Sequence, residues 1–526
     1  MHKLLNSKHY GVLLPLFSMS SKNDWGCGDF NSIVEWASFV KDIGLDIIQI
    51  LPLNEMEPQS NCPYTAITAF AIDPIYISIA DIDNLSPEVN KKINSREFKE
   101  RIKEIKKKEF IDYAGIKRIK FEVLWEQYKY FYDKFLTSDT IEKKSFDDYK
   151  NRNDYWLKDY SVFRRLKDVY NWKSWTEWDE EFKNPRSQKI EEFIRTNSFE
   201  IDFFNYLQWE IEKQSISAKE KLNSLGILLL GDLPFMVNQE SADVWSRQFD
   251  FSLDLESGAP PDAFSDEGQR WGIPAPNWQV QMQNNFEWWR LKLRKFEELY
   301  DIFRIDHMVG FFRTWVIPKD KTKKPDFDIL DPYQQEERGR LFLKTVTSST
   351  KMLAIAEDLG VIPDYVRKVL KEVEVCGYKI MRWEKGKDGR YIDSSNYERL
   401  SLATTSTHDT EPMKTWWRII DRIEKKSFLE MIYNRPIERL PKRYYDIKDD
   451  VSDKLLRANS ALVILNISDI IGSDDRINTP GTTGNHNWSF KIKSDSKKFY
   501  EKYMSDFDFL KKRIKEISDE KSDISN

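Results

Sequence analysis

The chain has 526 residues, enough for a large buried core and more than one structural unit. Its 82 Lys and Arg residues are balanced by 87 Asp and Glu residues, and the net charge of −5 disfavours nucleic acid or an anionic membrane as a partner. The three cysteines show no metal-ligand spacing and no apolar run has the length of a signal peptide or a membrane span, so we expect a cytoplasmic protein.

The N-terminal segment alternates between apolar strands and an amphipathic helix. Residues 11–16 predict a buried strand, and residues 47–53 predict a second one. Between them, Asp29 fits a helix N-cap, apolar residues keep helical spacing over residues 33–43, and Gly44 is a natural helix stop. A strand, a helix and a strand, with both strands apolar throughout, are typical of a parallel sheet covered on both faces.

A long, charged and mostly helical stretch then interrupts the pattern, and the alternation resumes at residue 226. Six more candidate strands follow, at residues 226–233, 303–307, 353–359, 378–383, 402–409 and 461–465. A Gly/Pro-rich segment, predicted to be a long loop, separates the first of these from a helix marked by apolar residues between Phe286 and Tyr300. Eight such strands predict an α/β fold, a closed (β/α)8 TIM barrel with its active site at the carboxyl ends of the strands. A doubly wound open sheet is the alternative, but no Gly-x-Gly-x-x-Gly motif follows any strand.

These elements predict how the chain is divided. Residues 1–53 form the first part of the barrel, and residues 54–225 form a mostly helical insertion after the second strand. Residues 226–490 complete the barrel, and residues 491–526 form a C-terminal helix with a polar tail. The aromatic clusters of the insertion suggest that it has a core of its own.

Four of the predicted strands end in acidic residues, namely Asp232, Asp306, Glu357 and Asp409. In a barrel these carboxylates converge on one mouth, where their repulsion raises the pKa of at least one and leaves others ionised. One carboxyl can then act as an acid while another acts as a nucleophile at the same pH. Arg304 lies two residues before Asp306, on the same face of a strand, and should keep that carboxylate ionised.

The residues alone leave three interpretations open. A retaining glycoside mechanism would use an Asp nucleophile and a Glu acid/base about 5–5.5 Å apart. A metal-dependent hydrolase could use Asp306, His307, Glu357, His408 and Asp409 as ligands. A binding protein could use the same groups only as ion pairs at strand ends. His307 and His408 do not distinguish the metal site from the sugar site, because a neutral imidazole can bind a metal or a sugar hydroxyl.

Three motifs carry a family resemblance, namely Phe303-Arg-Ile-Asp-His307, Ala356-Glu-Asp-Leu-Gly360 and Thr407-His-Asp409. Together they resemble the catalytic motifs of the amylomaltase (4-α-glucanotransferase) family, a relative of the α-amylases. Further segments match, namely Gly231–Pro234, Gly258–Asp262 through Gly268–Gly272, Pro63-Tyr64 with Ala69-Phe70, and Arg476–Gly481 with Asn487-Trp488. The matches run from about residue 11 to residue 488 in family order, and they cover the barrel better than the insertion.

The resemblance implies a retaining transglycosylase that acts on maltooligosaccharides and α-1,4-glucans without a metal or an organic cofactor. Asp306 would be the nucleophile that forms a β-glucosyl ester. Glu357 would be the general acid and then the base, and Asp409 would bind ring hydroxyls and favour a distorted sugar. The alternatives are an α-amylase-like hydrolase and, with less support, a barrel metallohydrolase.

The resemblance also implies substrate-binding roles. Arg304 would orient the nucleophile, His307 and His408 would bind the same sugar, and Asp232 would support the site. Tyr64 matches an aromatic platform beneath that sugar, and Trp271 would stack on the glucan on the acceptor side. Two further residues in matching segments, Gln269 and Asn478, are expected to bind substrate. Ala263 stands where the family often has an aromatic residue, which bears on acceptor preference.

Overall fold

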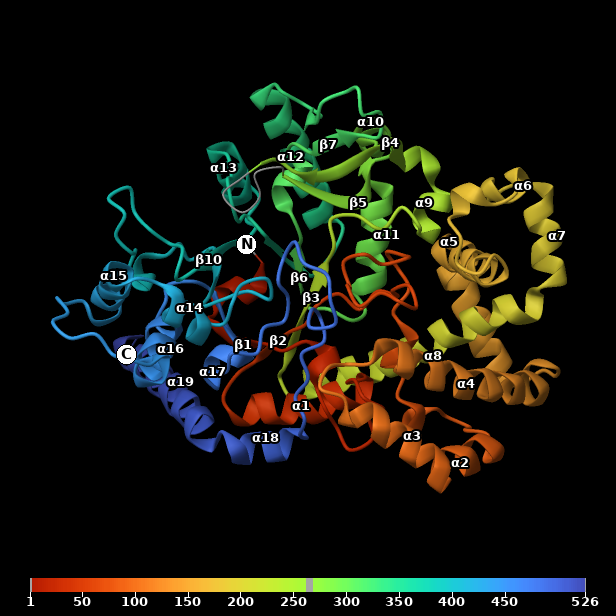
Figure 1. The fold of residues 1–526 in the computed structure, drawn as a ribbon, viewed down its shortest axis with the longest axis horizontal. Helices are drawn as coiled ribbons and strands as arrows, with labels where there is room; N and C mark the ends of the chain where they lie inside the picture. The colour runs from red at the N-terminus through yellow and green to blue at the C-terminus, as the bar shows by residue number, and fades with distance from the viewer. Residues whose placement is uncertain (1, 262–267, 526) are drawn as a thin grey trace.

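The computed structural model describes residues 2–261 and 268–525, with side chains up to residue 520, and its centre is a barrel of parallel strands (Figure 1). The strands are β1 (His9–Leu13), β2 (Ile47–Gln49), β3 (Leu228–Leu233), β6 (Ile302–Ile305), β9 (Leu353–Ala356), β10 (Gly377–Ile380), β11 (Ser401–Thr404) and β12 (Leu462–Asn466). They pair in the order β10-β11-β12-β1-β2-β3-β6-β9, and a parallel bridge between Ile355 and Cys376 joins β9 to the start of β10. The predicted (β/α)8 TIM barrel is confirmed, with eight strands that nearly close.

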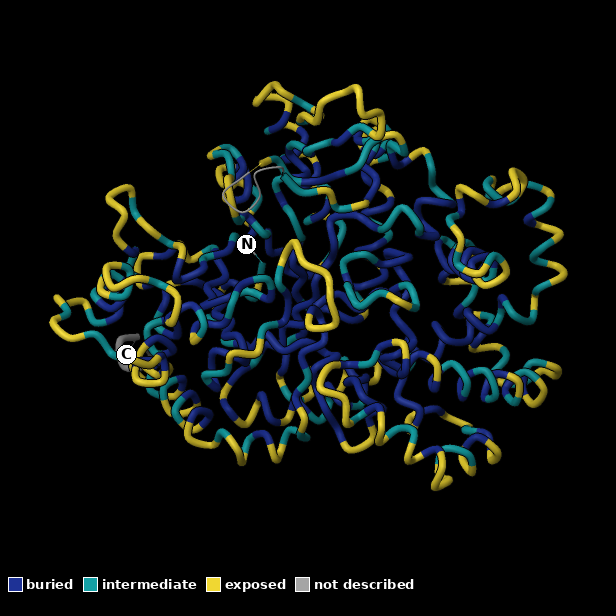
Figure 2. The backbone as a smooth tube through the Cα atoms, in the orientation of Figure 1, coloured by how far each residue is buried: buried dark blue, intermediate teal, exposed yellow. Residues whose placement is uncertain are grey.

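The barrel strands form where the sequence is apolar because both of their faces are covered. Every residue of β6, β9, β11 and β12 is buried, and Figure 2 shows buried backbone through the centre of the molecule. Close packing also demands small residues. A Cβ atom on Gly231 in β3 would lie 2.2 Å from the ring of Tyr300, so this glycine lets the buried ring lie against the strand.

The first barrel helix, α1 (Phe30–Asp42), confirms the prediction from its end signals. The Asp29 carboxylate accepts a hydrogen bond from the backbone N–H of Ser32 at 3.0 Å. Gly44 follows the helix with a φ of +84°, a conformation that favours glycine. The outer layer continues with α11 (Glu287–Phe296), α12 (Pro332–Ser348), α13 (Asp364–Glu372), α14 (Met413–Ile419), α15 (Arg422–Tyr433), α16 (Lys448–Leu456) and α17 (Ile467–Ile470).

Residues 54–225 are mostly helical, and most of their helices lie on the right of the barrel in Figure 1. The helices are α2 (Pro87–Asn94), α3 (Arg96–Lys107), α4 (Tyr113–Phe131), α5 (Ile141–Val169), α6 (Glu180–Lys183), α7 (Gln188–Thr196) and α8 (Ser198–Ser224). Aromatic rings join α4 to α8, where Phe131 lies 5.0 Å from Tyr206 and 5.1 Å from Trp209. The C-terminal half of α8 returns to the barrel, since Ala218 and Leu222 lie beside Ile33 of α1.

The prediction of a long loop between β3 and α11 was wrong. This segment contains α9 (Ala242–Ser246), β4 (Phe251–Ala259), β5 (Gln269–Pro276) and α10 (Trp278–Gln283). With β7 (Trp315–Pro318) and β8 (Asp326–Phe327), the two strands form an antiparallel sheet in the order β5-β4-β7-β8. Gly272, Pro274 and Pro276 in β5, together with register irregularities between β4 and β5, hide the alternation that identifies a strand.

The chain ends in two helices, α18 (Ser496–Lys502) and α19 (Met504–Ser525). The first packs on α1, where the ring of Phe499 lies 5.3 Å from that of Trp36. The second lies beside α16, and Arg513 pairs with Asp453 at 2.7 Å. Within residues 2–261 and 268–525, the helices include none that is both long enough and apolar enough to cross a membrane.

Candidate active site

The carboxyl ends of the barrel strands bring the predicted acidic residues together. Asp232 lies in β3, Asp306 directly follows β6, and Glu357 directly follows β9. Asp409 lies in the loop after β11. Parallel strands present their carboxyl ends at the same mouth of a barrel, which places these side chains on one surface.

The Arg304 guanidinium connects three of the four carboxylates. Its Nη1 atom lies 2.8 and 2.7 Å from the two carboxylate oxygens of Asp232 and 3.0 Å from Asp306 Oδ1. Its Nη2 atom lies 3.1 Å from Glu357 Oε2. Burial opposes the charge of Arg304, but Asp232 and the other carboxylates outweigh it and raise its pKa well above the usual value. A permanent positive charge therefore sits between Asp306 and Glu357.

Removing this charge should destabilise the protein strongly. Arg304 is only 3% exposed, so Arg304→Met would leave buried carboxylates without their counter-charge. We expect a loss of about 3–5 kcal/mol in the free energy of unfolding. Urea denaturation would measure it, with the exposed Arg390→Met as the control. Arg304→Lys should restore part of the stability, because an ammonium keeps the charge but not the forked geometry. Equal stability of wild type and Arg304→Met would contradict this role.

Glu357 is placed to carry a proton. Its Oε2 atom accepts a hydrogen bond from the backbone N–H of His307 at 2.8 Å. Burial raises the pKa of Glu357 to about 7, against the lowering effect of Arg304 and with help from the negative charge of Asp306. His307 itself has a φ of +47° at this turn, an uncommon conformation for a residue other than glycine. The turn at His307 therefore points its backbone N–H at the Glu357 carboxyl, which titrates near neutral pH.

The raised pKa predicts a basic limb in the pH profile. A general acid must be protonated to donate, so this limb of kcat/KM should be flat well below the pKa of Glu357 and fall as the pH rises through about 7. Initial rates of glucan transfer, measured from about pH 5 to about pH 9, would show this limb. Glu357→Gln should abolish the limb, whereas Glu384→Gln, at a carboxyl that pairs with Lys379 at 3.2 Å, should leave it in place. A profile flat through this range would contradict the assignment.

Asp409 is held ionised by its neighbours. Its Oδ2 atom lies 3.2 Å from Nε2 of His408, and its Oδ1 atom accepts a hydrogen bond from the Asn478 amide at 2.6 Å. Burial opposes ionisation, but the His408 charge and the Asn478 hydrogen bond lower the pKa of Asp409 to about 2. Arg476 donates to the Asp409 carbonyl at 2.7 Å and to the Asn478 carbonyl at 2.6 Å, which ties the two loops together.

Tyr64 comes from the insertion and reaches the barrel mouth. Its hydroxyl donates to Asp232 at 2.6 Å and lies 3.1 Å from Nε2 of His408. Its ring is stacked on the His408 ring, with centroids 5.5 Å apart and planes 18° apart. Burial raises the pKa of Tyr64 well above its usual value, so the hydroxyl remains a neutral donor. The ring of Trp488 packs on both, 5.3 Å from Tyr64 and 5.6 Å from His408.

The small antiparallel sheet supplies the other rim of the mouth. Trp271 in β5 meets the His307 ring edge-on at 4.6 Å, and its indole N–H donates to the side-chain oxygen of Gln269 at 3.1 Å. The ring of Phe235 lies 5.4 Å from His307 on another side. Burial among these groups lowers the pKa of His307 to about 4, so its imidazole is neutral at neutral pH.

The structure brings every predicted site residue to this mouth, while Asp262 and Ala263 lie outside the described residues. Sequence reasoning assigned no role to Arg476, Trp488 or Phe235. Arg476 and Trp488 lie within segments that match the family motifs, and this match could have identified them as site residues. Phe235 follows the matching Gly231–Pro234 segment and had no signal of its own.

Comparisons with known proteins match this architecture. A family model described as 4-alpha-glucanotransferase matches residues 14–496. The chain is 31% identical over 508 residues to a 4-alpha-glucanotransferase from Chlamydia caviae, covering 92% of this chain and 90% of that protein. A 4-alpha-glucanotransferase from Clostridium butyricum is 31% identical over 483 residues, covering 90% and 94%. An amylomaltase from Streptococcus agalactiae, solved in complex with acarbose, is similar with a TM-score of 0.80 and 25% identity, covering 96% of this chain and 98% of that one.

Proposed function

The chain belongs to the 4-alpha-glucanotransferase family, and from this premise we propose that its barrel mouth transfers segments of α-1,4-glucans to the 4-hydroxyl of another glucan. The observation that carries the proposal is the single Arg304 guanidinium that contacts both Asp306 and Glu357. One of these carboxyls can attack a sugar while the other exchanges a proton with the departing or arriving oxygen.

In the first half of the reaction, the Asp306 carboxylate attacks C1 of a glucose unit in the donor. The bond from C1 to the glycosidic oxygen breaks, and protonated Glu357 gives its proton to that oxygen. The products are a free 4-hydroxyl on the released segment and a β-glucosyl ester on Asp306. Burial and the negative charge of Asp306 keep a substantial fraction of Glu357 protonated at neutral pH for this step, because its pKa is about 7.

In the second half, the Glu357 carboxylate takes the proton from the 4-hydroxyl of an acceptor. The acceptor oxygen attacks C1, the ester bond breaks, and a new α-1,4 bond forms with retained configuration. Asp306 and Glu357 return to their starting states, so no proton or electron is consumed. Neither half requires a metal or an organic cofactor.

The neighbouring residues would bind the reacting sugar. We assign the ionised Asp409 to its ring hydroxyls, where hydrogen bonds can strengthen as the sugar flattens toward an oxocarbenium ion. His408 and the neutral His307 would contact the same sugar. Tyr64 would form an aromatic platform beneath that sugar. Trp271 and Gln269 on the opposite rim would contact the acceptor, since flat sugar faces pack well on indole rings.

The rival with the same fold is a hydrolase in which water attacks the ester. Transfer requires that an acceptor sugar outcompete water. We propose that residues 54–225, an insertion that supplies Tyr64, wall the cleft together with the β4–β5 hairpin. A metallohydrolase receives less support, because the positive charge among Asp232, Asp306 and Glu357 is the Arg304 guanidinium.

Incubation with maltotriose tests the proposed function. A transferase should produce glucose and longer oligomers while the number of reducing ends stays constant. A steady rise in reducing ends would instead establish a hydrolase. The same products formed at the same rate in excess chelator would eliminate a metal-dependent reaction, and a sample without enzyme serves as the baseline.

We also propose a cytoplasmic location for the protein. Its three cysteines, Cys27, Cys62 and Cys376, are all free, which suits a reducing compartment. Fractionation of the source cells, followed by detection of the protein with an antibody, would test this.

A further inference from the structure

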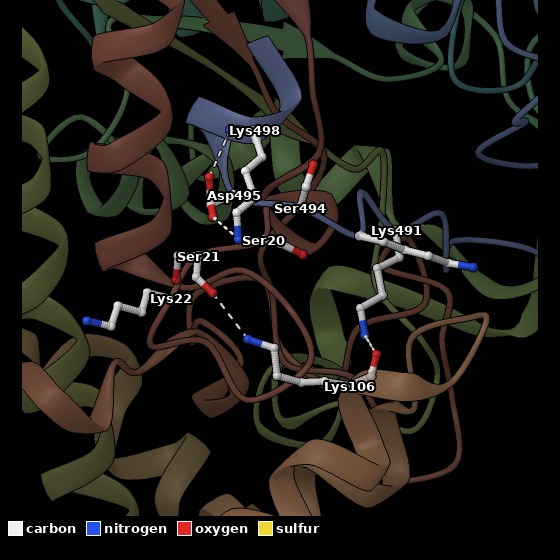
Figure 3. Close-up of a pocket in the computed structure, with 9 residues that line it drawn as sticks. Ser20, Ser21, Lys22, Lys106, Lys491, Ser494, Asp495 and Lys498 are labelled. Atoms are coloured by element: carbon white, nitrogen blue, oxygen red, sulfur yellow. Dashed lines mark hydrogen bonds and ion pairs between the residues drawn. The ribbon is translucent and has the colours of Figure 1, made fainter. Parts of the chain in front are cut away.

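A hollow elsewhere on the molecule is lined by none of the residues described above for the catalytic mouth. It has a volume of about 500 Å³, within the usual range for small-molecule sites. Three segments line it, namely the loop after β1, the end of α3, and the stretch that leads into α18 (Figure 3). The lining residues are Ser20, Ser21, Lys22, Lys106, Lys491, Lys493, Ser494, Asp495 and Lys498. We call this hollow the lysine pocket.

The composition of the lysine pocket is unlike that of a glucan site. Five of its lining residues are lysines, one is an aspartate, and the other three are serines. None of the lining residues in the described part of the chain is aromatic, so they offer neither a sugar face nor a nucleobase a surface on which to stack. The concentration of positive charge is local, because the whole chain carries a net charge of −5.

Two nearby carboxylates, those of Asp24 and Asp495, are already committed to structural partners. Asp24, buried under the pocket, pairs with Lys106 at 2.9 Å and also accepts hydrogen bonds from the backbone N–H groups of Ser21 and Gly26, both at 2.8 Å. Asp495 caps α18 by accepting from the Lys498 backbone N–H at 2.9 Å, and it lies 3.5 Å from the Lys498 ammonium. These two acids pair with Lys106 and Lys498, and the remaining lysines form no ion pair among the residues that the structure describes.

Lys491 and Lys493 lie close enough for their charges to interact, whereas the Lys22 side chain extends away from Lys491 (Figure 3). The Lys491 ammonium donates to the carbonyl of Lys106 at 3.0 Å (Figure 3), while Lys22 and Lys493 form no ion pair within the described part of the chain. Burial lowers the pKa of Lys491, and the charges of Lys106 and Lys493 lower it further against the opposing effect of Asp24. The Ser494 hydroxyl also has no hydrogen-bond partner among the residues that the structure describes. Lysine and serine side chains therefore outnumber the one carboxylate, Asp495, among the residues that line the pocket.

We propose that the lysine pocket binds a small, multiply charged anion that carries a phosphoryl group. Such a group brings close to two negative charges and three acceptor oxygens at neutral pH, which matches the ammonium groups that form no ion pair within the described residues and the free serine hydroxyl. Lysine binds phosphate as a point charge, without the forked geometry that arginine gives to planar carboxylates. The volume leaves room for a group attached to the phosphoryl moiety, such as a hexose.

Isothermal titration calorimetry at constant ionic strength, in a buffer free of phosphate, tests the proposal. The probes are inorganic phosphate, pyrophosphate and a hexose monophosphate, titrated into the full-length chain. We expect saturable one-to-one binding of at least one probe. The Lys491→Gln/Lys493→Gln double variant should weaken it by about tenfold or more. Lys497→Gln serves as the matched control, because Lys497 lies on α18 outside the pocket and should leave the affinity unchanged.

The outcomes separate the possibilities. Tighter binding of the hexose monophosphate than of inorganic phosphate supports the site and identifies a phosphorylated sugar, whereas equal affinity supports it and identifies the phosphoryl group alone. Absence of binding for all three probes overturns the proposal, as does an affinity unaffected by the double variant. If the double variant does not fold, Lys493→Gln decides alone, because this exposed side chain has no structural partner in the described ranges. Maltotriose turnover without phosphate should be unchanged in Lys493→Gln, which shows that the site is separate from the catalytic one.

Discussion

Asp306→Asn is expected to lower kcat for glucan transfer by about 10⁴-fold or more while leaving the fold intact. An amide cannot form the glycosyl ester, so the reaction loses its covalent path rather than a single contact. The Asn side chain keeps the size of Asp and can still accept a hydrogen bond from Arg304, whose other carboxylate partners remain. The rate of maltotriose disproportionation, followed by chromatography, measures the effect.

Two controls make the Asp306 result specific. Asp306→Asn should still bind maltotriose in calorimetry, which separates lost chemistry from lost binding. Asp358→Asn changes another acid at the end of β9, but this side chain turns away to accept from the Tyr378 backbone N–H at 2.7 Å and to pair with Arg367 at 3.2 Å. We expect it to change kcat by less than about tenfold. Normal turnover by Asp306→Asn would refute the nucleophile assignment.

Glu357→Gln is expected to lower kcat on maltotriose by about 10³-fold, because the leaving oxygen is no longer protonated and the acceptor is no longer deprotonated. An α-maltosyl fluoride donor should remain competent in the first half, since fluoride leaves without a proton. Azide should then restore turnover and yield an α-glycosyl azide, because an anionic nucleophile needs no base. A fluoride electrode and mass spectrometry measure both products.

The matched control for Glu357→Gln is Asp306→Asn, which azide should not rescue by the same route because no β-ester forms. If Glu357→Gln kept the wild-type rate on maltotriose, the acid/base assignment would be wrong. The same conclusion would follow if azide left the fluoride-release rate of Glu357→Gln unchanged.

The barrel could be predicted because its strands are buried on both sides. Segments such as β12 (Leu462–Asn466) are apolar up to their last residue, and α1 carries clear signals at both ends in Asp29 and Gly44. The antiparallel sheet could not be predicted in the same way. Its strand β5 contains glycine and proline, and it is stabilised by pairing with β4 rather than by its own pattern. Local sequence patterns therefore predicted the barrel but did not predict the antiparallel sheet that forms one rim of the site.

The identities of the candidate site residues were predicted better than the contacts between their side chains. Alternation along a strand paired Arg304 with Asp306, and they do lie 3.0 Å apart, although β6 ends at Ile305. The closer contact is with Asp232, which stands opposite Arg304 in the register between β3 and β6. Such a cross-strand contact depends on barrel register, which no single segment encodes. The packing of Trp488 on Tyr64 is likewise a product of tertiary structure.

The most direct test of the mechanism is to trap the covalent glycosyl ester on Asp306. Glu357→Gln should be mixed with α-maltosyl fluoride without an acceptor, quenched in acid, digested and analysed by peptide mass spectrometry. The first half can proceed because fluoride needs no acid, and the second is slow because the base is missing. We expect one added maltosyl group, located on Asp306. A group located on another carboxylate, or fluoride release with no labelled peptide at any time, would contradict a covalent Asp306 intermediate.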